Sequence, residues 1–110
     1  MNNTLKITII YAIIAIIFAY TYMAMHEQVH VSILRSYGID TKVHVGEFGA
    51  STTPTNQTDY DLKCTVECHQ SNNLTDVVGY HLIVLIFCLW GLFYIREIIN
   101  IKQIETMNYG

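Results

Sequence analysis

The run ITIIYAIIAIIFAYTYMAM, from Ile7 to Met25, contains nineteen residues and no charged side chain. A second run of nineteen, VVGYHLIVLIFCLWGLFYI from Val77 to Ile95, carries no charge apart from that of a protonated His81. As helices rising 1.5 Å per residue, each run would be about 28 Å long, close to the roughly 30 Å hydrocarbon core of a bilayer. The two runs therefore predict a membrane α-helical fold with two transmembrane helices.

The composition of the 110-residue chain supports this prediction. Apolar residues make up 52% of the chain and charged residues only 14%, whereas a soluble domain carries roughly 25% charged residues. The length suits a single membrane domain over residues 1–110, with membrane lipid as one partner. The net charge of −3 and the lack of a basic cluster argue against nucleic-acid binding.

The glycine positions set the ends of the expected helices. Because no Gly or Pro occurs before Gly38, the first transmembrane helix, about residues 5–25, should continue to about residue 37. The second transmembrane helix should run from about residue 76 to 98, with Asp76 or a Thr75 cap at its start. A small β-hairpin and loop segment, residues 38–75, is expected between them.

Within that segment, side-chain alternation predicts where the hairpin lies. Apolar and polar residues alternate from Ile39 to Phe48, which is typical of a strand. The polar segment 50–61 contains the only proline and is predicted to be a loop. Leu62–Gln70 could form a second strand that pairs with the first, and Ser71–Thr75 is predicted to be a turn.

The sequence HEQVH, from His26 to His30, directly follows the first apolar run. On a helix, side chains four residues apart lie on the same face, so both imidazoles can reach one zinc ion. Glu27 projects beside them, where it can hold a metal-bound water without binding the metal itself. This H-E-x-x-H pattern is typical of zinc hydrolases.

The residues after the motif extend the pattern. The stretch HEQVHVSILRSYGIDTKVHVGEFG, residues 26–49, resembles the start of the site-2 protease family and its small membrane-zincin relatives. That family follows HExxH with an R-x-x-G-I/V pattern, here Arg35 to Ile39, and with a strand whose end bears glycine and phenylalanine, here Val43 to Gly49. The resemblance implies a zinc-dependent intramembrane or membrane-interface metalloprotease. Its cofactor would be Zn²⁺, and its substrate a membrane protein or peptide that pairs with the edge of this strand.

The resemblance also implies a third zinc ligand, an aspartate on a later membrane helix, usually within an N-P-D-G sequence. This chain instead has NNLTD, from Asn72 to Asp76, at the head of the second expected helix. Asp76 is the residue of this chain that corresponds to the family's aspartate, so that His26, His30 and Asp76 would hold the metal. Glu27 would be the catalytic base that takes a proton from the attacking water.

Other readings of the polar residues stay open. Asp76 could be only a helix N-terminal acid, with His69 or His81 as an alternative ligand or oxyanion stabiliser. Cys64 and Cys68 could form a disulfide or remain free, since two residues four apart on a strand do not pair easily. A structural zinc site formed by these two cysteines and His69 is a further possibility.

A second hypothesis assigns the chain no catalysis. It could be a small two-span subunit of a larger membrane complex or a homo-oligomer, with the histidines structural or bound to a metal or cofactor. In either case Lys6 and Arg96, which flank the two apolar runs, indicate an integral membrane protein with both termini cytoplasmic. A cleaved signal peptide is the alternative for the first run, but no small-x-small cleavage site follows it.

Overall fold

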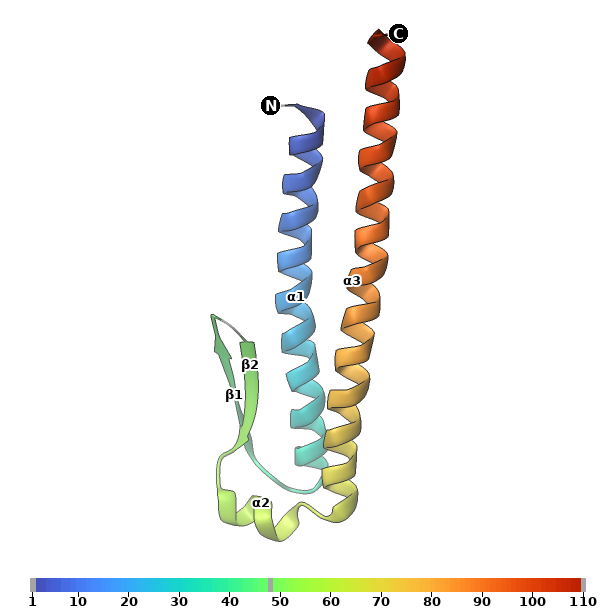
Figure 1. Cartoon of the computed structure of the whole chain (residues 1–110). Helices are drawn as coiled ribbons and strands as arrows, with labels where there is room; N and C mark the ends of the chain where they lie inside the picture. Colours follow the sequence, from blue (N-terminus) through green and yellow to red (C-terminus); the bar gives the residue numbers. More distant parts are fainter. Residues whose placement is uncertain (1, 48, 110) are drawn as a thin grey trace. The chain divides into compact units, whose positions relative to one another are not determined.

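The computed structural model describes residues 2–47 and 49–109 (Figure 1). In chain order its elements are helix α1 (Asn3–Ser36), strands β1 (Thr41–Gly46) and β2 (Gly49–Pro54), and helices α2 (Gln57–Lys63) and α3 (Val66–Tyr109). The coarse prediction is confirmed, because the chain is mostly helical and has two long apolar helices with a small antiparallel sheet between them in sequence.

Both long helices have the length and composition that a membrane crossing requires. Among the described residues, Asn3–Ser36 and Val66–Asn108 meet this requirement, with mean hydropathies of 2.1 and 2.2 over their most apolar 18 residues. At 1.5 Å per residue, α1 is about 51 Å long, so part of it must extend beyond a hydrocarbon core of about 30 Å. Likewise, α3 starts before and ends after the predicted range of about 76–98.

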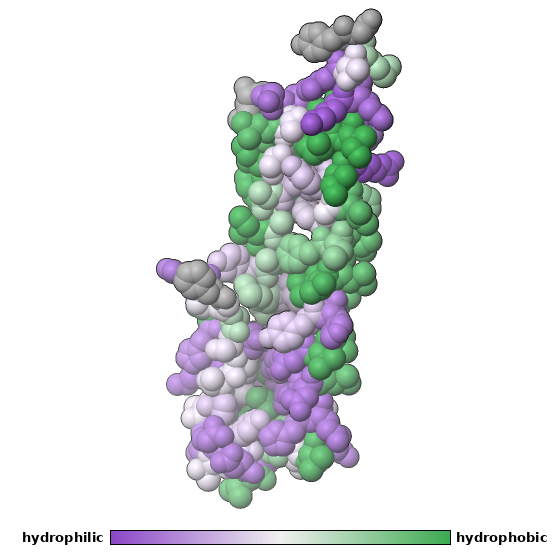
Figure 2. All heavy atoms as spheres, viewed as in Figure 1, coloured by the Kyte–Doolittle hydropathy of each residue, from purple (hydrophilic) through white to green (hydrophobic). Residues whose placement is uncertain are grey.

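The chain divides into two compact units, Met1–Phe18 with Leu82–Gly110, and Ala19–His81. In Figure 2 the first unit is mainly hydrophobic, whereas hydrophilic side chains gather over the hairpin and α2 of the second. Aromatic packing joins the two helices of the first unit. The ring centroid of Tyr11 lies 4.8 Å from the ring centroid of Trp90 and 5.4 Å from that of Tyr94. The hydroxyl oxygens of Tyr94 and Thr8 are 2.9 Å apart.

The second unit has a small core at the end of α1. Leu34 and Ile39 are 5% and 1% exposed and pack with Cys64 and Cys68. Gly38 has a φ of +77°, which a residue without a Cβ adopts without strain. The backbone amide of the next residue, Ile39, donates a hydrogen bond of 3.0 Å to the carbonyl of Leu34. The predicted glycine cap is therefore confirmed, and α1 ends within one residue of the predicted position 37.

The second strand lies earlier in the chain than predicted. β2 occupies Gly49–Pro54, all but its first residue within the loop expected over 50–61, and pairs antiparallel with β1 so that Val43 faces Thr52. Because Gly46 pairs with Gly49, the segment that directly follows β1 along the chain completes the hairpin. The prediction of a strand over Leu62–Gln70 is wrong.

The segment from Leu62 to Thr75 is largely helical, so the predicted turn is wrong as well. The side-chain oxygen of Asn56 accepts hydrogen bonds from two backbone N–H groups in the first turn of α2 and so caps that helix. The hydroxyl of Thr65 accepts a hydrogen bond of 3.3 Å from the backbone amide of Cys68, in the first turn of α3. With this cap, α3 begins well before the predicted start at Asp76. Polar residues that suggested a turn instead lie inside a helix.

Cys64 and Cys68 form a disulfide, with an S–S distance of 2.04 Å and Cα atoms 5.2 Å apart. Cys64 ends α2 and Cys68 lies in the first turn of α3, so the bridge joins two helices across their junction. Pairing at this spacing appeared difficult only because the segment was expected to be a strand. Since both sulfurs are bonded to each other, the alternative of a structural zinc with His69 is not supported.

We expect the double substitution Cys64→Ser/Cys68→Ser to lower the free energy of unfolding of the second unit by about 2 kcal/mol. This value follows from the chain entropy that a short cross-linked loop removes from the unfolded state. Denaturant titration in detergent, followed by circular dichroism, measures the effect. The control is Cys88→Ala, which removes an exposed free thiol. Equal unfolding midpoints for the native chain and the double variant would contradict a stabilising role for the disulfide.

Candidate metal centre

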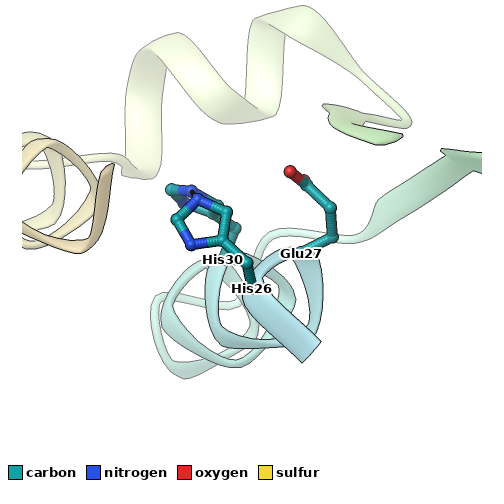
Figure 3. Close-up of side chains that lie close together, drawn as sticks. All are labelled: His26, Glu27 and His30. Carbon is teal, nitrogen blue, oxygen red and sulfur yellow. Dashed lines mark hydrogen bonds between the residues drawn. The ribbon is translucent and has the colours of Figure 1, made fainter. Parts of the chain in front are cut away.

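The two histidines of the motif lie on one face of α1, within the second unit. Their Nε2 atoms are 3.2 Å apart, and the ring planes of His26 and His30 meet at 82°. Figure 3 shows both rings pointing to the same side of the helix. The spacing of four residues therefore places two imidazole nitrogens where one ion can bind both.

Asp76 supplies a third donor atom from α3. Its Oδ1 lies 3.0 Å from His26 Nε2 and 2.8 Å from His30 Nε2. Three ligand atoms of a tetrahedral zinc site, each about 2.05 Å from the metal, lie about 3.3 Å from one another. The triangle formed here is only slightly smaller, and two imidazoles with one carboxylate are a donor set that zinc accepts. The residues therefore fit a zinc ion after small side-chain adjustments.

Glu27 lies beside the histidines and is held by the hairpin. It is the one charged residue buried in the described part of the chain, at 9% exposure. The hydroxyl of Thr52, on β2, donates a hydrogen bond to its Oε2. A carboxylate oxygen of Glu27 lies within 4.8 Å of the nitrogens of His26 and His30, and Figure 3 shows the carboxylate next to the rings. One water molecule can bridge a separation of this size.

Burial and charge set the protonation of the site, whose residues lie outside the two charge-free runs. The side chains of His26 and His30 are 14% and 12% exposed, and that of Asp76 is 47% exposed. Burial alone would lower the pKa of His30, but hydrogen bonds to Asn72 and Asp76 oppose this effect. Together with the negative charges of Asp76 and Glu27, these hydrogen bonds raise the pKa of His30 above its usual 6.5.

The pKa of the Asp76 carboxyl shifts in the opposite direction. Burial would raise the pKa of Asp76, but hydrogen bonds from His26 and His30 and their charges lower it below its usual value. His30 and Asp76 thus favour an ion pair. Because zinc binds neutral imidazole, protonation of His30 competes with zinc, so zinc binding should weaken as the pH falls.

A polar cleft of about 420 Å³ opens at the site within the second unit. Its wall includes Glu27, His30 and Asp76, together with Thr52 and Tyr80. Helices α1 and α3, the strand β2 and Tyr60 of α2 all contribute to the cleft, so a bound molecule would contact the motif and the hairpin at once.

An apolar groove of about 410 Å³ lies on another side of His26. Gly79 on α3 is part of this groove and is in close contact with the imidazole. A Cβ atom added at Gly79 would lie 2.6 Å from both Cε1 and Nδ1 of His26, closer than nonbonded atoms approach. The carbonyl of Gly79 also accepts a hydrogen bond of 2.7 Å from the hydroxyl of Tyr22. The missing side chain therefore makes room for the ring of His26.

We expect Gly79→Ala to displace the His26 ring and lower zinc affinity at least about tenfold, because small errors in ligand placement weaken a site strongly. The matched control is Gly91→Ala, also on α3, where an added Cβ meets nothing within 4 Å in the described structure. Both changes favour helix. Competition titration with a zinc chelator measures the affinities, and an unchanged value for Gly79→Ala would contradict this packing.

The two alternative histidines lie elsewhere. His69 Nδ1 is 3.3 Å from the hydroxyl of Tyr60, about two helical turns before Asp76. His81 is exposed, and its Nδ1 lies 2.7 Å from the carbonyl oxygen of Val77. Five residues turn a helix by about 140° beyond a full turn, which directs His81 away from the face of Asp76. Neither alternative ligand is supported.

Three residues near the site were not anticipated: Thr52, Asn72 and Gly79. Asn72 Oδ1 lies 2.8 Å from His30 Nδ1. Its position four residues before Asp76 would have placed it on the same helix face, had the segment been recognised as helical. Thr52 had no such signal, because its contact depends on a strand that was predicted to be a loop.

Comparisons of the chain with protein-family models, with curated proteins and with solved structures found no match. The resemblance to the site-2 protease family therefore rests on the quoted residues alone.

Proposed function

We propose that the chain is a membrane-anchored, zinc-dependent peptidase whose catalytic centre lies at or near the membrane interface. The observation that carries this proposal is the close triangle formed by His26 Nε2, His30 Nε2 and Asp76 Oδ1, with edges of 3.2, 3.0 and 2.8 Å. The combination of this triangle with an adjacent buried glutamate and a polar cleft supports hydrolysis more than metal storage.

The residues have distinct roles in the proposed reaction. His26, His30 and Asp76 would hold the zinc, which supplies a Lewis acid that polarises a peptide carbonyl and lowers the pKa of water. Glu27 accepts the proton of the attacking water and transfers it to the leaving amine. The hydrogen bond from Thr52 restricts the rotation of the Glu27 carboxylate and keeps it beside the histidines. The polar cleft would take the peptide.

The proposed location follows from the helices and the disulfide. The motif begins directly after the charge-free run that ends at Met25, and Asp76 directly precedes the run that starts at Val77. Two crossings would leave these residues just outside the hydrocarbon core on one side. A disulfide between Cys64 and Cys68 suits an oxidising compartment, which supports a centre outside the cytoplasm and termini inside it.

A second candidate is a non-catalytic subunit of a membrane complex. The observation that favours it is the exposure of Asp76, whose side chain is 47% exposed although the two histidines are nearly covered. A partner chain could cover this side of the site, and in that case the metal would serve structure or a neighbour's chemistry.

Hydrolysis by the purified chain separates the two candidates. The full chain in lipid nanodiscs, loaded with zinc, should cleave an unfolded protein such as casein, and 1,10-phenanthroline should stop the cleavage. Added zinc should restore it. If zinc-loaded chain leaves the substrate intact, while Asp76→Asn loses the metal, the catalytic proposal fails and the subunit proposal is favoured.

A further inference from the structure

Asn72 joins the metal centre to the start of α3. It lies four residues before Asp76, so both side chains are on the face of α3 that meets His30. Its Oδ1 is 2.8 Å from His30 Nδ1, and its Nδ2 donates to the carbonyl of Cys68 at 3.0 Å. One amide group therefore contacts both a proposed zinc ligand and a fixed backbone oxygen.

The contact with Cys68 determines which way the amide faces. If the amide were reversed, its oxygen would lie about 3.0 Å from the carbonyl oxygen of Cys68, where two acceptors repel each other. With Nδ2 directed at that carbonyl, the oxygen of Asn72 must face His30. The amide thus offers the imidazole an acceptor and no donor.

The acceptor at Nδ1 matches the proton that a zinc-bound His30 carries. When Nε2 binds zinc, the remaining proton of the neutral ring lies on Nδ1, where it can donate to Asn72. Nε2 is the atom that faces His26 and Asp76, at 3.2 and 2.8 Å. Without metal, Asp76 Oδ1 is itself an acceptor at Nε2, so both nitrogens of His30 face an acceptor and Asn72 holds the Nδ1 proton in either state.

The amide is itself anchored in a rigid part of the second unit. Cys68 is fully buried, at 0% exposure, and its disulfide to Cys64 ties the first turn of α3 to α2. The carbonyl that receives the Asn72 amide is therefore held in place by the core around Leu34 and Ile39. Asn73, the next residue, is exposed on the rim of the same cleft.

We propose that Asn72 is a positioning residue that fixes the ring orientation of His30 through its Nδ1 proton and so sets the zinc affinity of the site. The proposal deepens the proposed function and rests on it for the metal. Outer-shell partners of a ligating histidine contribute 10- to 100-fold to metal affinity in proteins. Asn72 acts through His30, and its effect should therefore appear in binding whether or not hydrolysis occurs.

The test compares Asn72→Leu, Asn72→Asp and the matched control Asn73→Leu, each as the full chain in nanodiscs. Leucine has the same branching at Cγ as asparagine but cannot accept a hydrogen bond, whereas aspartate keeps an acceptor opposite Nδ1 and loses the donor to Cys68. Zinc affinity is measured by chelator competition. The ¹H and ¹⁵N chemical shifts of the His30 Nδ1–H group report its hydrogen bond to residue 72, with zinc bound and, without metal, at a pH low enough to protonate His30.

We expect Asn72→Leu to lose 10- to 100-fold in zinc affinity and to shift the Nδ1–H proton of His30 upfield, because its hydrogen bond is lost. Asn72→Asp keeps the acceptor but loses the donor to Cys68, so it should keep more zinc affinity than Asn72→Leu. Asn73→Leu should match the native chain in both measurements. If folded Asn72→Leu keeps the native Nδ1–H shift and native affinity, or Asn73→Leu loses as much, the proposal is overturned. A native chain that binds no zinc would refute the proposed function, while the metal-free Nδ1–H shift would still test the role of Asn72.

Discussion

Replacing Glu27 with glutamine is expected to lower peptide hydrolysis by roughly 10²- to 10⁴-fold while zinc stays bound, because the change removes the general base alone. Glutamine has the shape of glutamate, and its side-chain oxygen can still accept the hydrogen bond from Thr52. Since the ligands His26, His30 and Asp76 are untouched, the metal content should not change. The initial rate of casein cleavage and the zinc content of the same sample measure both quantities.

The control for this substitution is Glu67→Gln, which neutralises an exposed acid in the first turn of α3. It should cleave at the native rate. Glu27→Gln with native activity would exclude the proposed base. Loss of zinc together with activity would mean that Glu27 is itself a ligand, which its carboxylate oxygen, within 4.8 Å of a nitrogen of each histidine, is close enough to be.

The second large effect is expected from Asp76→Asn, which should lower zinc affinity at least about a hundredfold. The change removes the only carboxylate whose oxygen lies within 3.0 Å of both histidine Nε2 atoms in the described chain. Loss of an outer-shell partner alone can reach this magnitude, so the loss of a direct ligand should equal or exceed it. The neutral amide also removes the charge that balances the metal.

Controls for Asp76→Asn test the ligand assignment. Asp61→Asn removes an exposed acid from α2, and His69→Ala and His81→Ala remove the two histidines that the sequence allowed as alternative ligands. All three should keep native zinc affinity in chelator competition. If His81→Ala loses zinc and Asp76→Asn does not, the triangle is wrong and the site assembles differently from the structure described.

Much of the site follows from the sequence, because it depends on helix periodicity. The spacing of His26 and His30 places them on one face of any helix, and no Gly or Pro interrupts the chain before Gly38. Asp76 was reached only through the family resemblance. Periodicity within one helix cannot show which residue of a distant helix meets the motif, so this contact required the three-dimensional structure.

The hairpin and the junction before α3 could not be predicted as well, since their order depends on specific caps and pairing. The segment Leu62–Gln70 could form a strand beside the first one by its position in the sequence. The cap at Asn56, the hydroxyl of Thr65 and the bridge from Cys64 to Cys68 instead favour helix there. In contrast, Gly49–Pro54 contains small and polar residues and becomes a strand by pairing with its neighbour. Local composition does not reveal such contacts.

The most direct test of the central claim is the zinc content of the purified chain beside that of the double variant His26→Ala/His30→Ala. Both are prepared in nanodiscs, incubated with zinc, desalted and analysed by inductively coupled plasma mass spectrometry, with circular dichroism to confirm equal helix content. We predict about one zinc per native chain and essentially none in the double variant. Native chain without zinc, or equal zinc in both equally folded proteins, would contradict a metal centre at this site.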